Sequence, residues 1–324
     1  MRRALCCSKD GPAMEPGEGH MGNVGLEYVV AAKELFSERY LTVAEANRRN
    51  YANVARHYVK YMAKIDSPEL LAEDLRRALG RLGNLGRKPV ALDACGGSGD
   101  AALMLQQLGC DVLLVDISPE MIGFYKEACA TAGFGAETQC SEIGSFFTRT
   151  QRRFDLIVFR SALHHLEDPV LVLQLAQKTL SPNGLIVTIF DPVKRSRWVN
   201  MAVKPLLWIR RAMSSPKLVL TRPIPVLRNM IRGGQKYKDR RKLEITDANV
   251  GMIAEFHAGR GFDDKALVQR ITGTANLSVL HHDYYTGRCG MLEKMIYKVS
   301  GSPRHFKLLL QNAESAGGPD QNSP

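Results

Sequence analysis

The stretch LDACGGSGD, residues 92–100, follows a short apolar run and precedes an Ala-rich one. Three glycines surround a single serine, and an aspartate stands near each end of the stretch. A glycine-rich turn of this kind joins a buried strand to a helix and brings backbone N–H groups close to a ligand. Residues 92–100 therefore predict a ligand-binding turn.

The sequence on either side of this turn indicates the fold. From Pro89 onward, PVALDA, DVLLVD, FDLIVF and GLIVTIF are apolar runs without alternation, as in strands buried on both faces. Helical patterns lie between them at 100–109, 119–132 and 168–180. We therefore expect an α/β fold with a doubly wound, Rossmann-like, mostly parallel sheet. LSVLHHDYY and LEKMIYKV are expected to add an antiparallel pair at its edge.

The change of texture along the chain divides it into segments. We expect an N-terminal helical cap over 23–88, a cofactor-binding core over 89–192 and a basic lid or insertion over 193–262. A C-terminal helix and edge strands over 263–310 would complete the core. Segments 1–22 and 311–324 are rich in Gly, Pro and polar residues and are predicted to be disordered tails.

Composition narrows the class of protein. The 324 residues are 45% hydrophobic and 24% charged, which is ordinary for a globular protein with a real core. The seven cysteines form no CxxC pair, which favours a reduced, cytoplasmic protein. No apolar run reaches the roughly 18–20 residues of a membrane span, and the first residues lack a secretory signal.

The net charge of +11 is concentrated in one segment. Between Val193 and Lys242 there are about 15 Lys and Arg residues against one Asp, so the rest of the chain is slightly acidic. The basicity therefore needs a local explanation.

Two kinds of cofactor compete for the glycine-rich turn. Residues 97–102 fit GxGxxA loosely, which permits a dinucleotide. Asp93, at the end of the first strand, would repel a pyrophosphate but attract a cationic amino group or sulfonium. Asp116 ends the next strand, where a carboxylate accepts hydrogen bonds from a ribose diol. Alternatively, both aspartates only cap helices.

Five motifs across residues 89–192 carry a family resemblance: ALDACGGSGD, LLVDISPEMI, CSEIGSF, FDLIVFRSALHHLEDP and LSPNGLIVTIFDP. In this order they resemble class I S-adenosylmethionine-dependent methyltransferases. The likeness is greatest to the branch that includes ubiquinone, menaquinone and many small-molecule methyltransferases.

The resemblance implies S-adenosyl-L-methionine as the cofactor. Asp116 would hold the ribose, Ile117 and Met121 would flank the adenine, and Glu142 would contact the adenine amino group. The full set of implied cofactor-binding residues is Asp93, Cys95, Gly96, Gly97, Ser98, Gly99, Asp116, Ile117, Met121, Glu142, Ile143, Arg160 and Tyr58.

Two positions depart from the family pattern. Cys95 stands where the family most often has the first glycine of the loop, and Glu142 replaces the commoner Asp. We interpret Cys95 as a small buried side chain in preference to a reactive thiol.

His164 and His165 follow the fourth predicted strand and are the candidate catalytic residues, as a general base or a substrate clamp. The alternative is a structural pair that bonds nearby backbone. His281 and His282 are consecutive on a predicted strand, so they face opposite ways and make a poor metal pair. No metal site is expected.

The basic segment bears on the methyl acceptor. WVNMAVKPLLWIRRAM contains both tryptophans among apolar residues and cations, a composition that suits an interfacial element. Segment 194–242 is thus expected either to contact an anionic membrane surface, as a peripheral attachment, or to form an ordinary substrate lid. A polyanion such as RNA is the less favoured partner, because no appended recognition module is present.

These observations predict methyl transfer to oxygen or carbon of a small or lipophilic acceptor. An RNA methyltransferase is the alternative enzyme. A non-catalytic, S-adenosylmethionine-binding assembly or sensor protein is the alternative from another class, motivated by Cys95 and Glu142.

Overall fold

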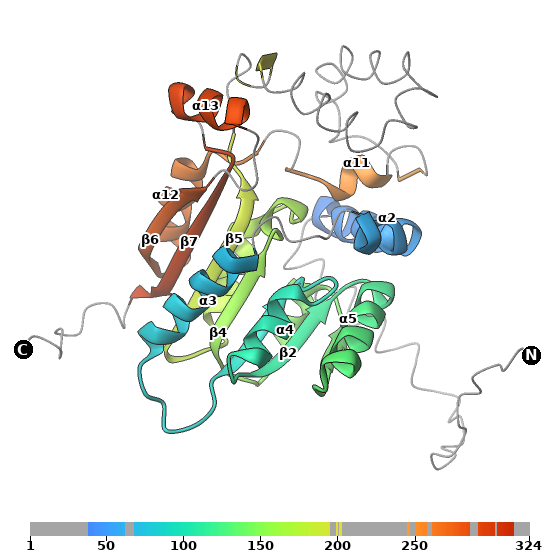
Figure 1. Ribbon diagram of the computed structural model, residues 1–324, viewed down its shortest axis with the longest axis vertical. Helices are drawn as coiled ribbons and strands as arrows, with labels where there is room; N and C mark the ends of the chain where they lie inside the picture. Colours follow the sequence, from blue (N-terminus) through green and yellow to red (C-terminus); the bar gives the residue numbers. More distant parts are fainter. Residues whose placement is uncertain are drawn as a thin grey trace, which may run out of the picture. The chain divides into compact units, whose positions relative to one another are not determined.

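A computed structural model describes residues 38–61, 68–194, 199, 201–202, 245–246, 250–257, 261–285, 291–301 and 303–313 (Figure 1). The chain divides into two units, Met1–Glu38 and Arg39–Pro324. Only Glu38 of the first unit lies within the described ranges, so the architecture below is that of the second unit.

A seven-stranded sheet forms the centre, in the order β3-β2-β1-β4-β5-β7-β6. The strands are β1 (Val90–Ala94), β2 (Asp111–Asp116), β3 (Glu137–Cys140), β4 (Phe154–Arg160), β5 (Leu180–Pro192), β6 (Leu277–Tyr285) and β7 (His305–Asn312). The first five are parallel, whereas β7 runs antiparallel to both β5 and β6. The predicted Rossmann-like, mostly parallel sheet with an antiparallel edge pair is therefore confirmed.

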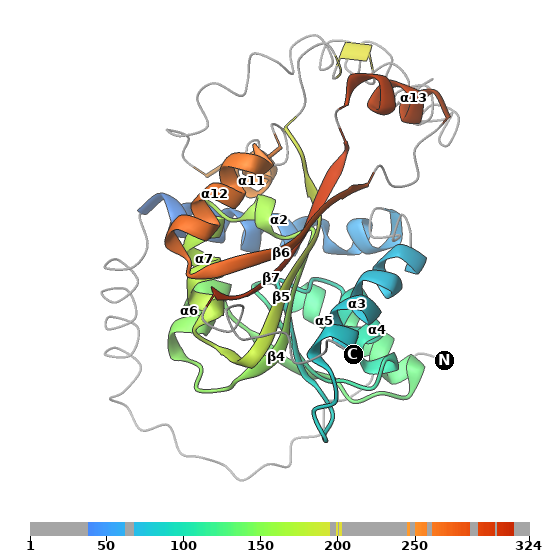
Figure 2. The same cartoon turned by 90° about the vertical axis from the view of Figure 1, so that its left-hand side faces the viewer.

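Helices cover both faces of the sheet. Figure 2 shows α3, α4 and α5 on one face, and α6, α7 and α12 on the other. Their bounds are α3 (Pro68–Leu82), α4 (Asp100–Gln107), α5 (Pro119–Ala132), α6 (Ile143–Arg149), α7 (Pro169–Gln177) and α12 (Asp264–Thr274). Burial on both faces explains why the central strands read as continuous apolar runs in the sequence.

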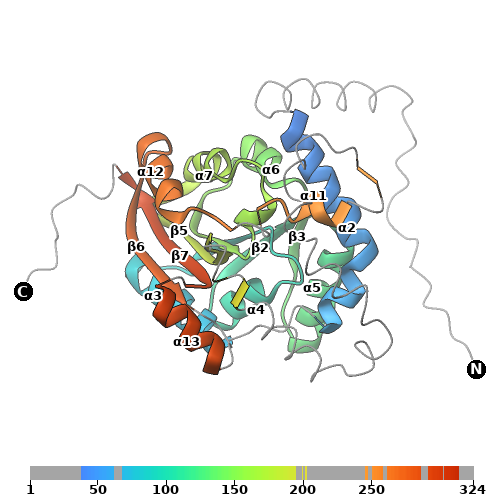
Figure 3. The same ribbon diagram turned by 90° about the horizontal axis from the view of Figure 1, so that it is seen from above.

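Further helices lie near the carboxyl ends of the parallel strands (Figure 3). They are α2 (Glu38–Tyr61), the short 3-10 helix η1 (Leu163–His165) and α11 (Val250–Ala254). Val43 and Ala46 of α2 pack against Val250, Ile253 and Ala254. This small apolar cluster holds α2 and α11 together beside the functional end of the sheet.

The partner of the edge strand differs from the sequence expectation. LSVLHHDYY forms β6 as predicted, but LEKMIYKV lies in helix α13 (Met291–Ser300). Its apolar residues Leu292, Met295, Ile296 and Val299 recur at the spacing of a helix, which accounts for the difference from the expected strand. The true partner is β7, which includes Gln311 and Asn312 from the expected C-terminal tail.

Strand β3 and helix α6 also had no strand or helix prediction. The side chains of β3 at the sheet edge are mostly exposed, so the strand leaves no apolar run in the sequence.

Helix α5 begins and ends as its sequence indicates. Ser118 caps its first turn, and Gly133 adopts the left-handed conformation at its end.

Most of the expected lid, 193–262, lies outside the described residues, including nearly all of segment 194–242. The expected tail 1–22 also lies outside them. None of the helices in the described ranges combines the length and the apolar character that a bilayer crossing demands.

Candidate functional site

A pocket opens at the carboxyl ends of β1, β2 and β4, where the strand order reverses on either side of β1. Ligands of open α/β sheets bind at such switch points. The predicted cofactor residues that line it are Cys95, Gly96, Gly97, Ser98, Asp116, Ile117, Met121, Glu142, Ile143 and Arg160. The tertiary structure therefore brings residues from four loops and strand ends into one cavity.

The glycine-rich turn is shaped by close contacts below it. A Cβ on Gly96 would lie 2.7 Å from Leu114 Cδ1 and 2.8 Å from the Asp93 carboxyl group, so only glycine fits there. Gly97 has φ +57°, a conformation that glycine adopts at no steric cost. These positions explain why the turn contains so many glycines.

Cys95 also adopts a left-handed conformation, with φ +56°. This is the position where the resembling family most often has glycine, and a side chain there carries a strain cost of roughly 1–2 kcal/mol. Burial, with a further contribution from Asp116, raises the pKa of the Cys95 thiol. A thiol with a raised pKa is a poor nucleophile, in line with the interpretation of Cys95 as a packing residue.

Asp116 at the end of β2 fastens the turn. Its Oδ2 accepts a hydrogen bond from Gly97 N at 2.8 Å, and its Oδ1 accepts one from Ser118 N at 2.8 Å. Burial raises the pKa of Asp116, and these backbone hydrogen bonds oppose that rise. Each carboxylate oxygen keeps a second lone pair, so Asp116 can still accept hydrogen bonds from a ligand diol.

Glu142 caps the helix α6. Its Oε1 accepts from Gly144 N at 2.8 Å, while its Oε2 accepts from Ser145 N at 2.7 Å and from Ser145 Oγ at 2.8 Å. The carboxylate lines the pocket with most of its acceptor capacity already used. Ile143, the next residue, presents an apolar side chain to the same pocket.

Asp93 lies beneath the turn and does not line the pocket. Its side chain is buried, and Oδ2 accepts a hydrogen bond from Ala102 N at 2.9 Å in the first turn of α4. Its Oδ1 has no hydrogen-bond partner among the described residues. Burial raises the pKa of Asp93 to about 7. The hydrogen bond from Ala102 N agrees with the alternative that Asp93 caps a helix.

The lining of the pocket is acidic. Of the described residues around it, Asp116, Glu142 and Glu167 are carboxylic acids, whereas Arg160 carries the positive charge. The Arg160 guanidinium is itself paired with Asp100 at 3.1 Å. Such a pocket favours a ligand with a net positive group over a pyrophosphate.

His165 lines the pocket from η1. Its Nδ1 lies 3.1 Å from the carbonyl oxygen of Ala254, which only accepts, so Nδ1 carries the proton. Its Nε2 lies 3.3 Å from Tyr51 Oη of α2. Burial, together with the neighbouring His164, lowers the pKa of His165 to about 3, and the ring is therefore neutral at pH 7.

His164 sits behind the pocket lining and pairs with an acid of β5. Asp191 Oδ1 lies 2.9 Å from His164 Nδ1 and also accepts the His164 backbone N–H at 3.1 Å. Burial raises the pKa of Asp191, and the hydrogen bonds from His164 lower it. A bulge in β5, where Phe190 has φ +67°, precedes Asp191 and changes the direction of its side chain.

Several residues of the site were missed in the sequence. Asp191 is a third acid at the end of a buried strand. The same sequence feature, an aspartate directly after an apolar run, had identified Asp93 and Asp116 and could have identified it too. Tyr51, Asn47 and Glu255 have no such signal, because they come from α2 and from the residue after α11.

Three predicted site residues do not line the pocket. Gly99 lies at the start of α4 against Tyr125, and Asp93 and His164 lie behind the lining. The backbone of Tyr58 belongs to α2, but its side chain lies outside the described residues. His281 and His282 point to opposite faces of β6, toward Arg81 and Asp264 respectively, as expected.

Comparison with known proteins gives the family. Residues 58–218 match the model of a methyltransferase domain, which is about half of the chain. Over 175 residues the chain is 29% identical to the tRNA 5-carboxymethoxyuridine methyltransferase of Escherichia coli (strain K12). This alignment covers 52% of the chain and 66% of the relative, just under two thirds of its length.

Solved structures are similar at low identity. One is a putative sarcosine dimethylglycine methyltransferase from Galdieria sulphuraria, with 15% identity, a TM-score of 0.47 and coverage of 76% of this chain and 86% of that one. Another is the N-methyltransferase NodS from Bradyrhizobium japonicum WM9 in complex with S-adenosyl-l-homocysteine. It has 15% identity, a TM-score of 0.46 and coverage of 84% of this chain and 98% of that one.

The five motifs, the sheet order and the match to a methyltransferase domain agree with one another. The chain belongs to the class I S-adenosylmethionine-dependent methyltransferases.

Proposed function

We propose that this protein transfers a methyl group from S-adenosylmethionine to an oxygen or carbon atom of a small or lipophilic acceptor. The observation that carries the proposal is the acidic pocket around the glycine-rich turn. S-adenosylmethionine bears a sulfonium and an ammonium group, and both are attracted by the carboxylates that line this pocket. A dinucleotide, with its two phosphates, would be repelled by them.

The residues fit this cofactor. Gly96 lets the turn pack directly on the strands, because a Cβ at this position would lie 2.7 Å from Leu114 Cδ1 and 2.8 Å from the Asp93 carboxyl group. In our proposal, Asp116 holds the ribose hydroxyls, and Ile117 and Met121 enclose the adenine, all three from the pocket wall. In our proposal Asp93 does not contact the cofactor directly. It supports the glycine-rich turn from beneath and accepts a hydrogen bond from Ala102 N.

When bound, S-adenosylmethionine supplies a methyl group activated by its sulfonium. The contribution of the protein is to align the acceptor with that methyl group and to exclude water. Val43 and Ala44 of α2 and Leu166 after η1 give the pocket an apolar wall beside His165. This wall supports an acceptor with apolar surface.

His165 is suited to position an acceptor rather than to remove its proton. A general base works best with a pKa near the operating pH, whereas the pKa of His165 is lowered to about 3. Its Nε2 lone pair, near Tyr51 Oη, can instead accept a hydrogen bond within the pocket. His164 would support this arrangement from behind through Asp191.

The first test is calorimetric binding of S-adenosylmethionine and S-adenosylhomocysteine to the wild type and to Asp116→Ala. Hydrogen bonds to a charged group contribute about 1.5–3 kcal/mol, so we expect the variant to bind at least about tenfold more weakly. Asp111→Ala, at the exposed amino end of the same strand, is the matched control and should bind as the wild type does. Equal affinities for all three proteins would contradict the placement of the ribose.

A second candidate function is methylation of RNA. It is supported by the tRNA methyltransferase among the relatives and by the positive charge between Val193 and Lys242. Transfer of labelled methyl groups to total tRNA, compared with phenols and quinone precursors, separates the two acceptor classes. Product only with tRNA, together with salt-dependent retention in a gel shift, would replace the small-molecule proposal.

Three further expectations remain proposals. Segment 194–242 would attach the protein to an anionic membrane surface, which predicts salt-sensitive sedimentation with anionic liposomes. A variant with Arg210, Arg211, Arg240 and Arg241 changed to Gln should no longer sediment with the liposomes.

A non-catalytic sensor would bind S-adenosylmethionine without turnover on any acceptor class. The cytoplasmic location also stays a prediction.

A further inference from the structure

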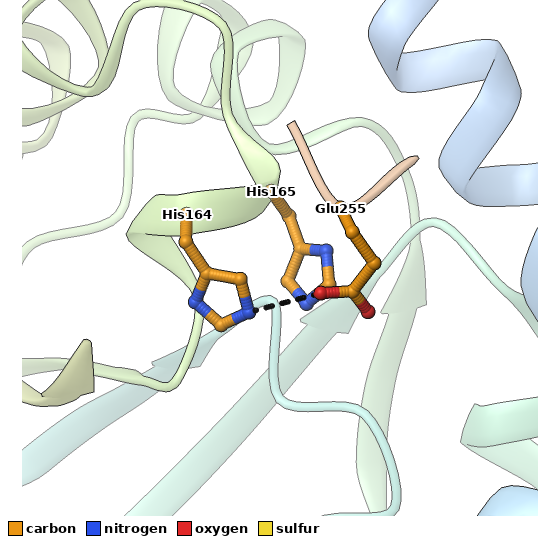
Figure 4. A group of neighbouring side chains, drawn as sticks. All are labelled: His164, His165 and Glu255. Carbon is orange, nitrogen blue, oxygen red and sulfur yellow. Dashed lines mark ion pairs between the residues drawn. The ribbon is translucent and has the colours of Figure 1, made fainter. Parts of the chain in front are cut away.

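We propose that His164, His165 and Glu255 bind a divalent first-row transition-metal ion at the edge of the pocket. One ligand atom from each of the three side chains lies within 4.8 Å of the other two. Figure 4 shows both imidazole rings directed toward the carboxylate of Glu255. The distance from His164 Nε2 to Glu255 Oε2 is 3.7 Å.

The hydrogen bonds on the far side of each ring support metal binding. His164 Nδ1 faces the Asp191 carboxylate at 2.9 Å, and His165 Nδ1 faces the Ala254 carbonyl oxygen at 3.1 Å. Histidine ligands of metal ions are oriented by such an acceptor at the other ring nitrogen. A ring whose Nδ1 faces such an acceptor presents its Nε2 to a metal ion, and His164 Nε2 lies 3.7 Å from Glu255 Oε2.

The two rings are also close together, with centroids 4.1 Å apart. A metal ion between them would accept electron pairs from both rings and from the Glu255 carboxylate at once. At His165 Nε2 it would replace the 3.3 Å contact with Tyr51 Oη. A proton shared between His164 and Glu255 would satisfy only part of the cluster, and the experiment below distinguishes the two cases.

The backbone around the cluster is fixed by hydrogen bonds from distant elements. His257 N donates to the His164 carbonyl oxygen at 2.8 Å, and Asn47 Nδ2 donates to that of His165 at 3.1 Å. These bonds tie η1 to α2 and to the residues after α11. The backbone of the two histidine ligands is thereby held in place before any ion binds, which reduces the cost of assembling the site.

The geometry needs only small side-chain movements. Zinc–nitrogen and zinc–oxygen bonds of about 2.0–2.2 Å place tetrahedral ligands roughly 3.4 Å apart. The 3.7 Å between His164 Nε2 and Glu255 Oε2 is close to that value. The Glu255 side chain is 42% exposed, and a change of its rotamer would bring the carboxylate nearer to both rings.

The donor set indicates the class of ion. Two imidazoles and one carboxylate suit Zn²⁺, Fe²⁺, Co²⁺ or Ni²⁺, whereas Mg²⁺ and Ca²⁺ prefer all-oxygen sites. Three protein ligands leave at least one position open. Because His165 lines the pocket, that position would face the acceptor, and this last step rests on the proposed function.

The test is a titration of the full chain, stripped with a chelator, with Co²⁺ and then with Zn²⁺. We expect one Co²⁺ per chain with a Kd of about 1 µM or tighter, a visible absorption band and displacement by Zn²⁺. Glu255→Gln and His165→Gln should each weaken binding at least about tenfold. Asp191 orients His164 without contacting the ion, so Asp191→Asn should weaken metal binding about 10–100-fold.

His281→Gln is the matched control, because His281 lies on β6 away from the cluster, and its affinity should equal that of the wild type. No uptake of Co²⁺ or Zn²⁺ by the wild type would overturn the proposal. So would binding that persists in both Glu255→Gln and His165→Gln, or a near-ultraviolet band from thiolate ligands. S-adenosylmethionine binding, measured separately without metal, tests the proposed function and the fold of each variant independently.

Discussion

At the residue scale, Gly99 and Gly133 share a left-handed backbone conformation but differ in what surrounds them. Their φ angles are +80° and +77°. A Cβ on Gly99 would overlap the ring of Tyr125, which is itself fully buried. A Cβ on Gly133 would meet nothing within 4 Å. The pair therefore separates backbone strain from steric overlap.

We predict that Gly99→Ala destabilises the protein by about 3 kcal/mol or more, because strain and overpacking add. Gly133→Ala should cost only the strain, about 1 kcal/mol. Urea unfolding monitored by circular dichroism measures both free energies of unfolding. Similar costs for the two variants would mean that Tyr125 moves aside easily.

At the element scale, Asp168 holds the start of α7. Its Oδ1 accepts from Val170 N at 3.1 Å and from Leu171 N at 3.3 Å, and it lies 3.4 Å from Arg270 in α12. The ion pair is largely exposed, so it contributes little. The cap is the larger contribution, because it satisfies two N–H groups that have no partner within the helix.

We predict that Asp168→Ala lowers the free energy of unfolding by about 1 kcal/mol. Asp168→Asn keeps the cap and loses only the ion pair, so its cost should be a few tenths of a kcal/mol. Thermal and urea unfolding of the two variants against the wild type test this directly. An equal loss in the two variants would assign the stability to the ion pair with Arg270 instead, because both variants lack it.

At the scale of the whole molecule, Arg87 and Asp155 join the segment before β1 to β4. The guanidinium donates to both carboxylate oxygens, at 2.6 and 2.8 Å, and Val90 N donates to Oδ2 at 2.8 Å. Burial alone would raise the pKa of Asp155. The hydrogen bonds from Arg87 and Val90 outweigh it and hold the pKa below its usual value.

This depressed pKa makes stability depend on pH with a definite sign. The ionised carboxylate stabilises the native state at every pH above the unfolded value of about 3.9, and that stabilisation is lost as the pH falls through the lower native pKa. We predict that Asp155→Asn costs about 2 kcal/mol at pH 7 and that the deficit shrinks below pH 4.

Urea unfolding between pH 2.5 and pH 7 measures this deficit. Asp111→Asn is the control, since its ion pair with Lys88 is long, at 4.0 Å, and exposed. It should show little change at any pH. A deficit for Asp155→Asn that stays constant down to pH 2.5 would show that packing, not charge, is responsible.

The sequence was most informative where a local pattern has one physical cause. Apolar runs without alternation predicted the central strands, because burial on both faces removes the polar positions. The placement of Asp116 at the pocket also followed from sequence, since the carboxyl ends of parallel strands meet at one edge. Cys95 was correctly identified as a departure, and its φ of +56° gives the reason why glycine is usual there.

Only the tertiary structure decided which distant segments pair. β7 lies between β5 and β6, although its sequence offered no sign of that partnership. Likewise, no local pattern places Glu255 beside His164 and His165, because their meeting depends on how α11 packs against α2. Periodicity reports the environment of one element at a time. The partners of that element are chosen by packing between segments far apart in the chain, and this decided both the edge of the sheet and the cluster beside the pocket.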